Sequence, residues 1–466
     1  MKTNFAYDNE DLWRKDRDHF IHPWTDFSVF HEQGSDVMAE AEGAYVYDAK
    51  GNRYMDGIGG LWCVNIGYGR DDMADAIATQ VRRIPYYSPF HHLTTPPGAE
   101  LAAKLAELTP KGLDHVFYGS GGSMANDTAI RMVHFYFNQR GQPKKKQIIS
   151  RVDAYHGSTY LAAALTGIMA DRVCFDQPDE IVHHISAPYV YRRPDGMSVA
   201  EFCDAKVAEL EDKILEIGPD NVACFIAEPI MGAGGVIVPP PGYHRRTLEV
   251  CHKYDVLYIS DEVVTAFGRL GHFFASEPVF DIVPDIICSA KGLTSGYLPL
   301  AATIISDAMY EVISVPQAKG AYFTHGFTYS GHLVCCAAAL KNIEIIERED
   351  ICGHVREVGP YFEERLASLL DLPLVGDVRG KNFMLCVENV ADKETKELLP
   401  PEAKVGDRIA HHAQERGLIV RPLGHLNVMS PPLILSKGQI DELVDTLGAA
   451  IRATMDDLVK EGLWKD

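Results

Sequence analysis

The sequence predicts an α/β protein with a large domain built on a mainly parallel sheet and a smaller α+β domain. Between about residues 75 and 310, short β-rich runs alternate with helical patterns, and near-continuous apolar strands between helices are typical of a parallel sheet covered on both faces. A chain of 466 residues is also too long for one simple core. We expect an N-terminal segment at 1–70, a large domain at 71–330 and a small domain at 331–466.

The N-terminal segment contains a predicted β-hairpin, "AYVYDAKGNRYMDG". Alternating apolar residues lie on either side of Asp48, Gly51 and Asn52, which form a strong turn signal. The segment begins with a charged stretch that lacks the apolar core of a secretion signal. Because chain ends often lie near each other, we expect this segment to pack with the small domain.

The two domains are predicted from apolar runs and helical periodicity. The large domain has six candidate strands, "HVFY", "QIIS", "VACFIA", "VLYIS", "DIICSA" and "LAATIIS". The small domain is predicted from a helical stretch, "CCAAALKNIEIIERED", two strands, "NFMLCVEN" and "LIVRPL", and a final helix over "KGQIDELVDTLGAAIRATMDDLVKEG".

Composition and charge exclude several classes of protein. The formal net charge of −21 argues against binding to nucleic acid or to an anionic membrane, and no apolar run is long enough to span a bilayer. The ten cysteines have no C-x-x-C spacing, so we expect reduced residues of a cytoplasmic protein. The histidine doublets lack ligand spacing, which argues against a metal site.

Polar residues follow five of the predicted strands, at positions where a turn does not require them. In chain order they are Ser120, Tyr155, Glu228, Asp261 and Lys291. In open parallel sheets the ligand crevice lies at the carboxyl ends of the strands. We therefore expect these five residues to face one crevice.

A glycine-rich stretch, "YGSGGSMANDTAI", links the first of these strands to a helix. Free N–H groups at a helix start bind anions, and glycines let the backbone approach a phosphate. The alternative interpretation is an ordinary glycine-rich turn with a serine as helix cap. The stretch matches neither the Walker nor the G-x-G-x-x-G motif.

Asp261 and Lys291 each have a structural interpretation as well as a functional one. An aspartate after a buried strand is usually half of an ion pair or a helix cap, and a lysine there usually extends its charged end to solvent. Alternatively, Asp261 accepts a hydrogen bond from a protonated heteroaromatic nitrogen, and a partly desolvated Lys291 attacks an aldehyde. An anion cup, a carboxylate, an aromatic ring at Tyr155 and such a lysine are together the contacts that pyridoxal 5'-phosphate (PLP) requires.

The stretch "YISDEVVTAFGRLGHFFASEPVFDIVPDIICSAKGLTSGYLPLAA" resembles the signature of the class III aminotransferases of PLP fold type I. The resemblance extends from "YVYDAKGNRYMDGIGGLWCVNIGYG" to "GLIVRPLGHLNVMSPPLI", nearly the whole chain, and is greatest to the ω-amino acid:pyruvate group, which includes amine:pyruvate transaminases. It implies a mainly parallel sheet of the seven-stranded type, PLP as cofactor, and a homodimer, or a tetramer, with active sites at the subunit interface.

The resemblance also implies roles for individual residues. Lys291 binds the cofactor aldehyde and moves the substrate proton, Asp261 pairs with the pyridinium nitrogen, and Tyr155 stacks on the ring. The remaining cofactor-binding residues are His156 beside Tyr155, Glu228 in support of Asp261, Val263 under the ring, Gly121, Gly122 and Ser123 in the phosphate cup, and Thr328, which reaches the phosphate of the neighbouring subunit. Trp62 and Phe90 line the substrate pocket, and Arg421 binds the substrate carboxylate.

The cup departs from the family pattern. Family members usually have Ser-Gly-Ser-Glu-Ala, whereas this chain has Gly121-Gly122-Ser123-Met124-Ala125. The backbone donors remain, so we still expect phosphate binding, with one contact fewer from Gly121.

The expected reaction is a ping-pong transfer of an amino group from an ω-amino acid or amine, such as β-alanine, taurine or an aryl or alkyl amine, to an α-keto acid, pyruvate. The nearest alternative with the same fold is an aminomutase or a decarboxylating transaminase. Two others are a cofactor-free lyase that uses Lys291 as a Schiff base, and a non-catalytic PLP-binding protein.

Overall fold

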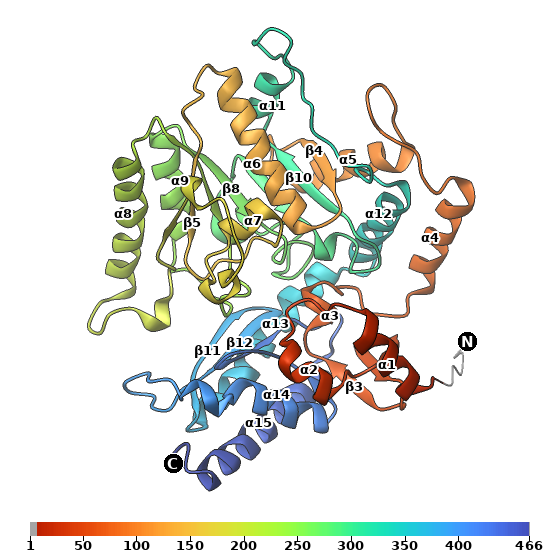
Figure 1. The fold of residues 1–466 in the computed structure, drawn as a ribbon, viewed down its shortest axis with the longest axis vertical. Coiled ribbons are helices and arrows are strands. Elements are labelled where there is room, and N and C mark those ends of the chain that lie inside the picture. Colours follow the sequence, from red (N-terminus) through yellow and green to blue (C-terminus); the bar gives the residue numbers. More distant parts are fainter. Residues whose placement is uncertain (1–6, 466) are drawn as a thin grey trace.

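The computed structural model describes residues 7–465. Residues 1–6 and residue 466, the outermost residues of the predicted N-terminal segment and small domain, lie outside the described part. Figure 1 shows two lobes, with the N-terminal and C-terminal parts of the chain together in the lower one and the middle of the chain in the upper one.

The upper lobe is built around a seven-stranded sheet in the order β4-β10-β9-β8-β7-β5-β6. The strands are β4 (His115–Gly119), β5 (Gln147–Arg151), β6 (Val182–Ile185), β7 (Val222–Ala227), β8 (Leu257–Asp261), β9 (Ile286–Ser289) and β10 (Ala301–Ile305). Only β10 runs antiparallel to its neighbours. The predicted α/β class and mainly parallel sheet are confirmed, and β6 is a strand that the sequence analysis missed.

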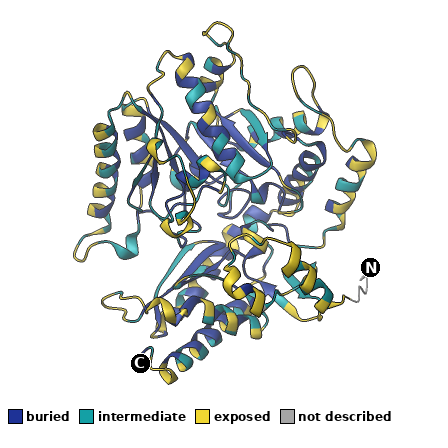
Figure 2. Cartoon of the chain, viewed as in Figure 1, coloured by how far each residue is buried: buried dark blue, intermediate teal, exposed yellow. Residues whose placement is uncertain are grey.

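Helices cover both faces of this sheet. Side chains of β5, β7 and β8 alternate between two cores, so Ile148 packs with the helices of one face and Ile149 with those of the other. The first face is covered by α6 (Gly122–Gln139), α7 (Tyr160–Leu165) and α11 (Asp307–Ile313), and the second by α8 (Val199–Ile217) and α9 (Tyr243–Lys253). Figure 2 shows the resulting buried centre of the upper lobe.

The N-terminal segment forms a small sheet with a strand from near the C-terminus. The strand order is β1-β2-β3-β13, and β3 pairs in parallel with β13. The strands are β1 (Met38–Glu42), β2 (Tyr45–Asp48), β3 (Arg53–Asp56) and β13 (Leu418–Ile419), and the helices of the segment are α1 (Asn9–His19), α2 (Phe27–Gln33) and α3 (Gly59–Trp62). The predicted hairpin is confirmed by the antiparallel pairing of β2 with β3.

A third sheet, in the order β11-β12-β15-β14, forms the rest of the lower lobe. Its strands are β11 (Val375–Lys381), β12 (Met384–Asn389), β14 (Arg421–Leu423) and β15 (Leu426–Met429), and its helices are α13 (Ile351–Ala367), α14 (Val405–Glu415) and α15 (Lys437–Lys460). Ser436 and Gln439 form a capping box that starts α15 where its apolar face begins.

Four further helices complete the chain: α4 (Asp71–Arg83), α5 (Pro96–Leu108), α10 (Ser276–Phe280) and α12 (Leu333–Arg348). In residues 7–465, no helix is long and apolar enough to cross a bilayer, and no cluster of side chains could hold a metal ion. All ten cysteines are free.

Candidate active site

The five predicted residues lie at one edge of the large sheet. Asp261 is the last residue of β8, Glu228 directly follows β7, and Lys291 lies just beyond β9. Ser120 and Tyr155 follow β4 and β5. Because these strands point the same way, their carboxyl ends form a common rim, as expected for an α/β binding site.

Asp261 is the polar centre of this rim and is only 4% exposed. Its Oδ2 accepts a hydrogen bond from Asn126 Nδ2 (2.8 Å) and lies 2.7 Å from His156 Nδ1, and its Oδ1 accepts from the Val263 N–H (3.1 Å). These contacts compensate the buried carboxylate for lost hydration. A carboxylate offers about four lone-pair sites, so the group still has acceptor capacity for a ligand.

Asn126, in the second turn of α6, was missed by the sequence analysis. Its amide nitrogen donates both to Asp261 and to the carbonyl oxygen of His156 (2.7 Å), and thereby joins α6 to the end of β8 and to the loop that follows β5. No local pattern in the sequence marks Asn126, because Asp127 and Thr128 follow it and its burial appears only in the fold.

The Glu228 carboxylate accepts hydrogen bonds from backbone N–H groups and forms none with Asp261. Its Oε1 accepts from the Tyr155 N–H (3.0 Å) and its Oε2 from the Gly232 N–H (2.8 Å). Burial raises the pKa of this carboxyl group, with the neighbouring Asp261 charge acting in the same direction and His156 opposing. The support that Glu228 gives is therefore to the loop that carries Tyr155 and His156.

The Tyr155 ring is half-buried in the loop that follows β5. Its hydroxyl lies 3.1 Å from Ser158 Oγ, and Trp24 of the N-terminal segment contacts the ring edge-on, with 5.5 Å between centroids. Burial raises the pKa of the Tyr155 hydroxyl, so it stays protonated at neutral pH.

The side chain of Lys291 has no hydrogen-bond or ion-pair partner among the described residues. Burial lowers the pKa of its ammonium group, and the charges of Asp261 and Glu228 oppose this shift. A lysine that is partly desolvated and unpaired is poised to act as a nucleophile or as a base.

The predicted cup is the first turn of α6. Gly121 precedes the helix in extended conformation, and no group in the described chain accepts from the N–H groups of Gly122, Ser123 and Met124. A Cβ on Gly122 would lie 2.9 Å from the Val263 side chain, whereas one on Gly121 would meet nothing within 4 Å. The cup thus consists of three N–H groups without acceptors, and the Val263 side chain packs against it at Gly122.

The predicted substrate-binding residues lie in different surroundings. Trp62 is 5% exposed and packs in the apolar cluster between the lobes. Arg421, on β14, is half-buried, and its guanidinium has no hydrogen-bond or ion-pair partner within the described chain. Burial lowers the pKa of the guanidinium, and the neighbouring Tyr155 and Asp171 oppose this shift.

Phe90 and Thr328 lie together on an exposed surface. Phe90 packs against Gly326, and the Tyr86 hydroxyl donates to the Thr328 carbonyl oxygen (2.6 Å). Phe90 is 41% exposed and the Thr328 side chain is exposed. Within one chain, these two residues form a separate face that includes Tyr329, which is also exposed.

The rim fits PLP on the evidence of its open groups. The unsatisfied N–H donors at the start of α6 are suited to bind a phosphate. The space between Gly122 and Val263 is so narrow that a single Cβ on Gly122 would fill it. Asp261 suits a pyridinium N–H, and the unpaired Lys291 suits an aldehyde.

Comparison with known proteins shows the family. Residues 30–451 match the aminotransferase class-III family. The putrescine–pyruvate aminotransferase of Pseudomonas aeruginosa is 44% identical over 92% of this chain and 93% of its own length. The diaminobutyrate–2-oxoglutarate transaminase of Halomonas elongata is 41% identical over 97% of this chain and 98% of its own.

The same relationship holds among solved structures. The crystal structure of the ω-transaminase from Pseudomonas jessenii in complex with PMP has a TM-score of 0.93 and 39% identity to this chain, over 96% of this chain and 98% of that one. Because members of this family are PLP-dependent aminotransferases, the alternatives of a cofactor-free lyase and of a non-catalytic PLP-binding protein are excluded. The chain belongs to the class III aminotransferases and is a PLP-dependent enzyme.

Proposed function

We propose that this aminotransferase moves an amino group from an ω-amino acid or amine, such as β-alanine, taurine or an aryl or alkyl amine, to pyruvate, and releases alanine by a ping-pong mechanism. The observation that carries the proposal is Arg421, whose half-buried guanidinium lies near Tyr155 and has no partner within the described chain. A guanidinium so placed is suited to hold the carboxylate of an α-keto acid in a bidentate pair.

Asp261 and Lys291 have complementary roles in this proposal. When bound, PLP supplies an aldehyde and an electron-withdrawing ring. The buried Asp261 carboxylate favours a protonated ring nitrogen opposite it. Lys291 Nζ takes the proton from the donor carbon that bears the amine, and burial, which lowers its pKa, favours the neutral form that this step needs.

The donor must use the pocket that also binds the keto acid. A donor without a carboxylate next to its amine leaves Arg421 unpaired, so we expect the arginine to engage the acid and turn away from an apolar donor. Trp62 and Tyr155 then provide the apolar wall. The relatives named above for putrescine and diaminobutyrate support an amine or ω-amino acid donor.

We further propose a cytoplasmic homodimer, or a tetramer built from it, in which Thr328 binds the phosphate of the neighbouring subunit and Phe90 lines the substrate pocket. The exposure of both residues, together with Tyr329, supports a shared interface on this face. Light scattering of the wild type is expected to give at least a dimer, and Thr328→Ala is expected to weaken cofactor binding about tenfold through one lost charge-assisted hydrogen bond. A monomer with full activity would contradict this part.

The test of the reaction is a donor screen with pyruvate, followed by alanine release, in the wild type and in Lys291→Ala. We expect alanine from the wild type with at least one amine or ω-amino acid, and no multiple turnover from the variant. A variant that sustains turnover, or a wild type that forms no alanine with any donor, overturns the proposal. Retention of the amino group in the product, or release of carbon dioxide, would instead identify the aminomutase or the decarboxylating transaminase.

Arg421→Ala separates the two half-reactions. We expect the reaction with pyruvate to slow by at least tenfold more than the reaction with an apolar amine, because only the acid uses the guanidinium. Single-turnover absorbance measurements give both rates, and equal losses would remove Arg421 from its proposed role.

A further inference from the structure

The backbone around Lys291 is held in an unfavourable conformation. Lys291 has a φ of 39° and Ser295 a φ of 49°, both in the left-handed region that disfavours residues other than glycine. Lys291 also begins a single 3₁₀ helix, residues 291–293, one residue after β9, and we call residues 290–297 the turn. A short, strained turn does not keep its shape by itself, so contacts from outside it must do so.

Asn342, on α12, makes those contacts. Its side chain is fully buried, and its amide nitrogen donates to the carbonyl oxygens of Gly292 (2.8 Å) and Leu293 (3.0 Å). Its amide oxygen accepts from Ser295 Oγ (2.6 Å). One side chain therefore ties the residues that directly follow Lys291 to α12.

The far side of the turn is tied to the segment that follows Trp62. Ser295 Oγ accepts from the Ile66 N–H (3.3 Å). The Tyr297 hydroxyl donates to the Gly67 carbonyl oxygen (2.9 Å) and accepts from the Arg70 N–H (3.2 Å).

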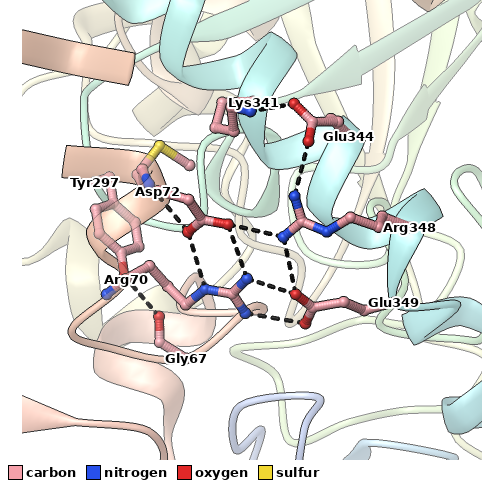
Figure 3. A network of polar contacts seen from close by, with 9 residues as sticks. Gly67, Arg70, Asp72, Tyr297, Lys341, Glu344, Arg348 and Glu349 are labelled. Atoms are coloured by element: carbon pink, nitrogen blue, oxygen red, sulfur yellow. Dashed lines mark hydrogen bonds and ion pairs between the residues drawn. The ribbon is translucent and has the colours of Figure 1, made fainter. Parts of the chain in front are cut away.

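Arg70 is itself fixed to α12, the helix that carries Asn342. Its guanidinium forms ion pairs with Asp72 and Glu349, and Asp72 and Glu349 also bind Arg348 at the end of α12 (Figure 3). The segment at 66–70 and α12 therefore form one frame around the turn.

We propose that Asn342 is a positioning residue for the reaction: its amide holds the strained turn so that Lys291 Nζ points into the crevice beside Asp261. The inference rests on the role proposed above for Lys291. Asn342 lies behind the turn and bonds only to Gly292, Leu293 and Ser295, so it acts through the backbone.

Asn342→Leu tests this, because leucine branches at the same carbon atom as asparagine but has no hydrogen-bonding groups, and it adds no charge that would shift a pKa directly. Asn389→Leu is the matched control. Asn389 is equally buried and donates twice, to the carbonyl oxygen of His425 (2.8 Å) and to Asn427 Oδ1 (3.0 Å), but it lies at the end of β12 in the third sheet.

The experiment uses the holoenzymes and two readouts. The first is the pH midpoint of the visible absorbance band of the lysine-bound cofactor, which depends on how the Lys291 nitrogen is held. The second is kcat and KM with the best donor. We expect Asn342→Leu to move the midpoint by at least half a pH unit and to lower kcat at least tenfold with little change in KM, and Asn389→Leu to change neither.

If Asn342→Leu does not fold, Asn342→Ser and Ser295→Ala replace it, with a midpoint shift and a several-fold loss of kcat expected for each. An unchanged midpoint in the variants, or equal effects at Asn342 and Asn389, overturns the inference. Lys291→Ala is measured in the same experiment, and multiple turnover by that variant would overturn the proposed function itself. If Lys291→Ala is inactive but Asn342→Leu has the midpoint and kcat of the wild type, only the positioning role of Asn342 is overturned.

Discussion

The cup at residues 121–124 and the turn at residues 290–297 bind opposite ends of the same cofactor in our proposal, yet they are built in opposite ways. The cup leaves three N–H groups open and keeps its space with Gly122 against Val263. The turn is strained at Lys291 and tied by side chains on two sides.

This difference follows from what each region must do. A phosphate is bound by donors that are free to reach it, so the cup needs space and unsatisfied N–H groups. A lysine that bonds to an aldehyde and moves a proton needs a fixed direction, so the turn needs supports. Missing contacts therefore indicate where the ligand lies, and satisfied buried polar groups indicate what aims the reacting side chain.

The largest effect is expected between the two regions, at Asp261. Asp261→Asn keeps the shape of the side chain but removes the charge that favours a protonated ring nitrogen, so we expect kcat to fall by about 10³-fold. Steady-state kinetics on variant holoenzyme measure the loss, and a fall of less than tenfold would contradict the role of Asp261.

The adjacent carboxylate is the matched control. Glu262 is fully buried and accepts from the N–H groups of Ala275 (2.7 Å) and Ser276 (2.8 Å), away from the rim. We expect Glu262→Gln to lower the thermal midpoint while the surviving folded enzyme keeps most of its kcat. A 10³-fold loss of kcat at Glu262 as well would mean that both carboxylates serve structure alone.

The next effect is expected within the cup. A Cβ on Gly122 would lie 2.9 Å from Val263, so Gly122→Ala must displace the wall of the cup or the phosphate, and we expect PLP affinity to fall about tenfold or more. Gly121→Ala is the control, because its Cβ would meet nothing within 4 Å and its φ of −174° suits any residue. Titration of apoenzyme with PLP measures both, and equal affinities would argue against this cup.

A smaller effect is expected at the outer support of the turn. Tyr297→Phe removes the hydroxyl that joins the turn to Gly67 and Arg70, and we expect kcat to fall about fivefold, equivalent to about 1 kcal/mol. Tyr361→Phe, which removes a hydroxyl bonded to Asp441 on α15, is expected to leave kcat unchanged. Similar kcat values for the two variants would mean that Asn342, and not Tyr297, holds the turn in place.

The smallest effect concerns stability and spares activity at neutral pH. His244 is buried against the Pro229 carbonyl oxygen (2.9 Å), and burial lowers its pKa to about 3. Above pH ~6.5 the imidazole of His244 is neutral in both the folded and the unfolded state. Between that pH and pH 5 the unfolded state takes up a proton on this residue and the folded state does not. The free energy of unfolding therefore decreases as the pH is lowered, by about 2 kcal/mol at pH 5 from this group.

Urea unfolding at pH 7 and pH 5 checks this prediction. We expect the wild type to lose about 2 kcal/mol more than His244→Gln between the two pH values. Equal losses would mean that His244 titrates alike in both states.

The fold class was predictable because strand and helix periodicities alternate so regularly in the middle of the chain. The short β6 was not, since its polar histidines, His183 and His184, hide the apolar pattern of a strand. The pairing of β3 with β13 joins residues far apart in the chain, and no local pattern indicates such a partner.

In the site, the reactive side chains at the strand ends were predictable from the sequence, whereas the helix residues that hold them in place were not. Asp261 and Lys291 follow strands directly, so their common rim follows from topology. Asn126 and Asn342 lie within helices, and only the packing of those helices shows which strand or turn they reach. Glu228 was expected to support Asp261, but its oxygens bind the Tyr155 and Gly232 N–H groups instead.

That Lys291 is the lysine that binds the cofactor can be tested by trapping the bond. Purified holoenzyme is reduced with borohydride and digested, and the peptides are analysed by mass spectrometry. We expect a phosphopyridoxyl adduct on Lys291, near one per chain. An adduct on another lysine, or none on an enzyme that carries PLP, would contradict it.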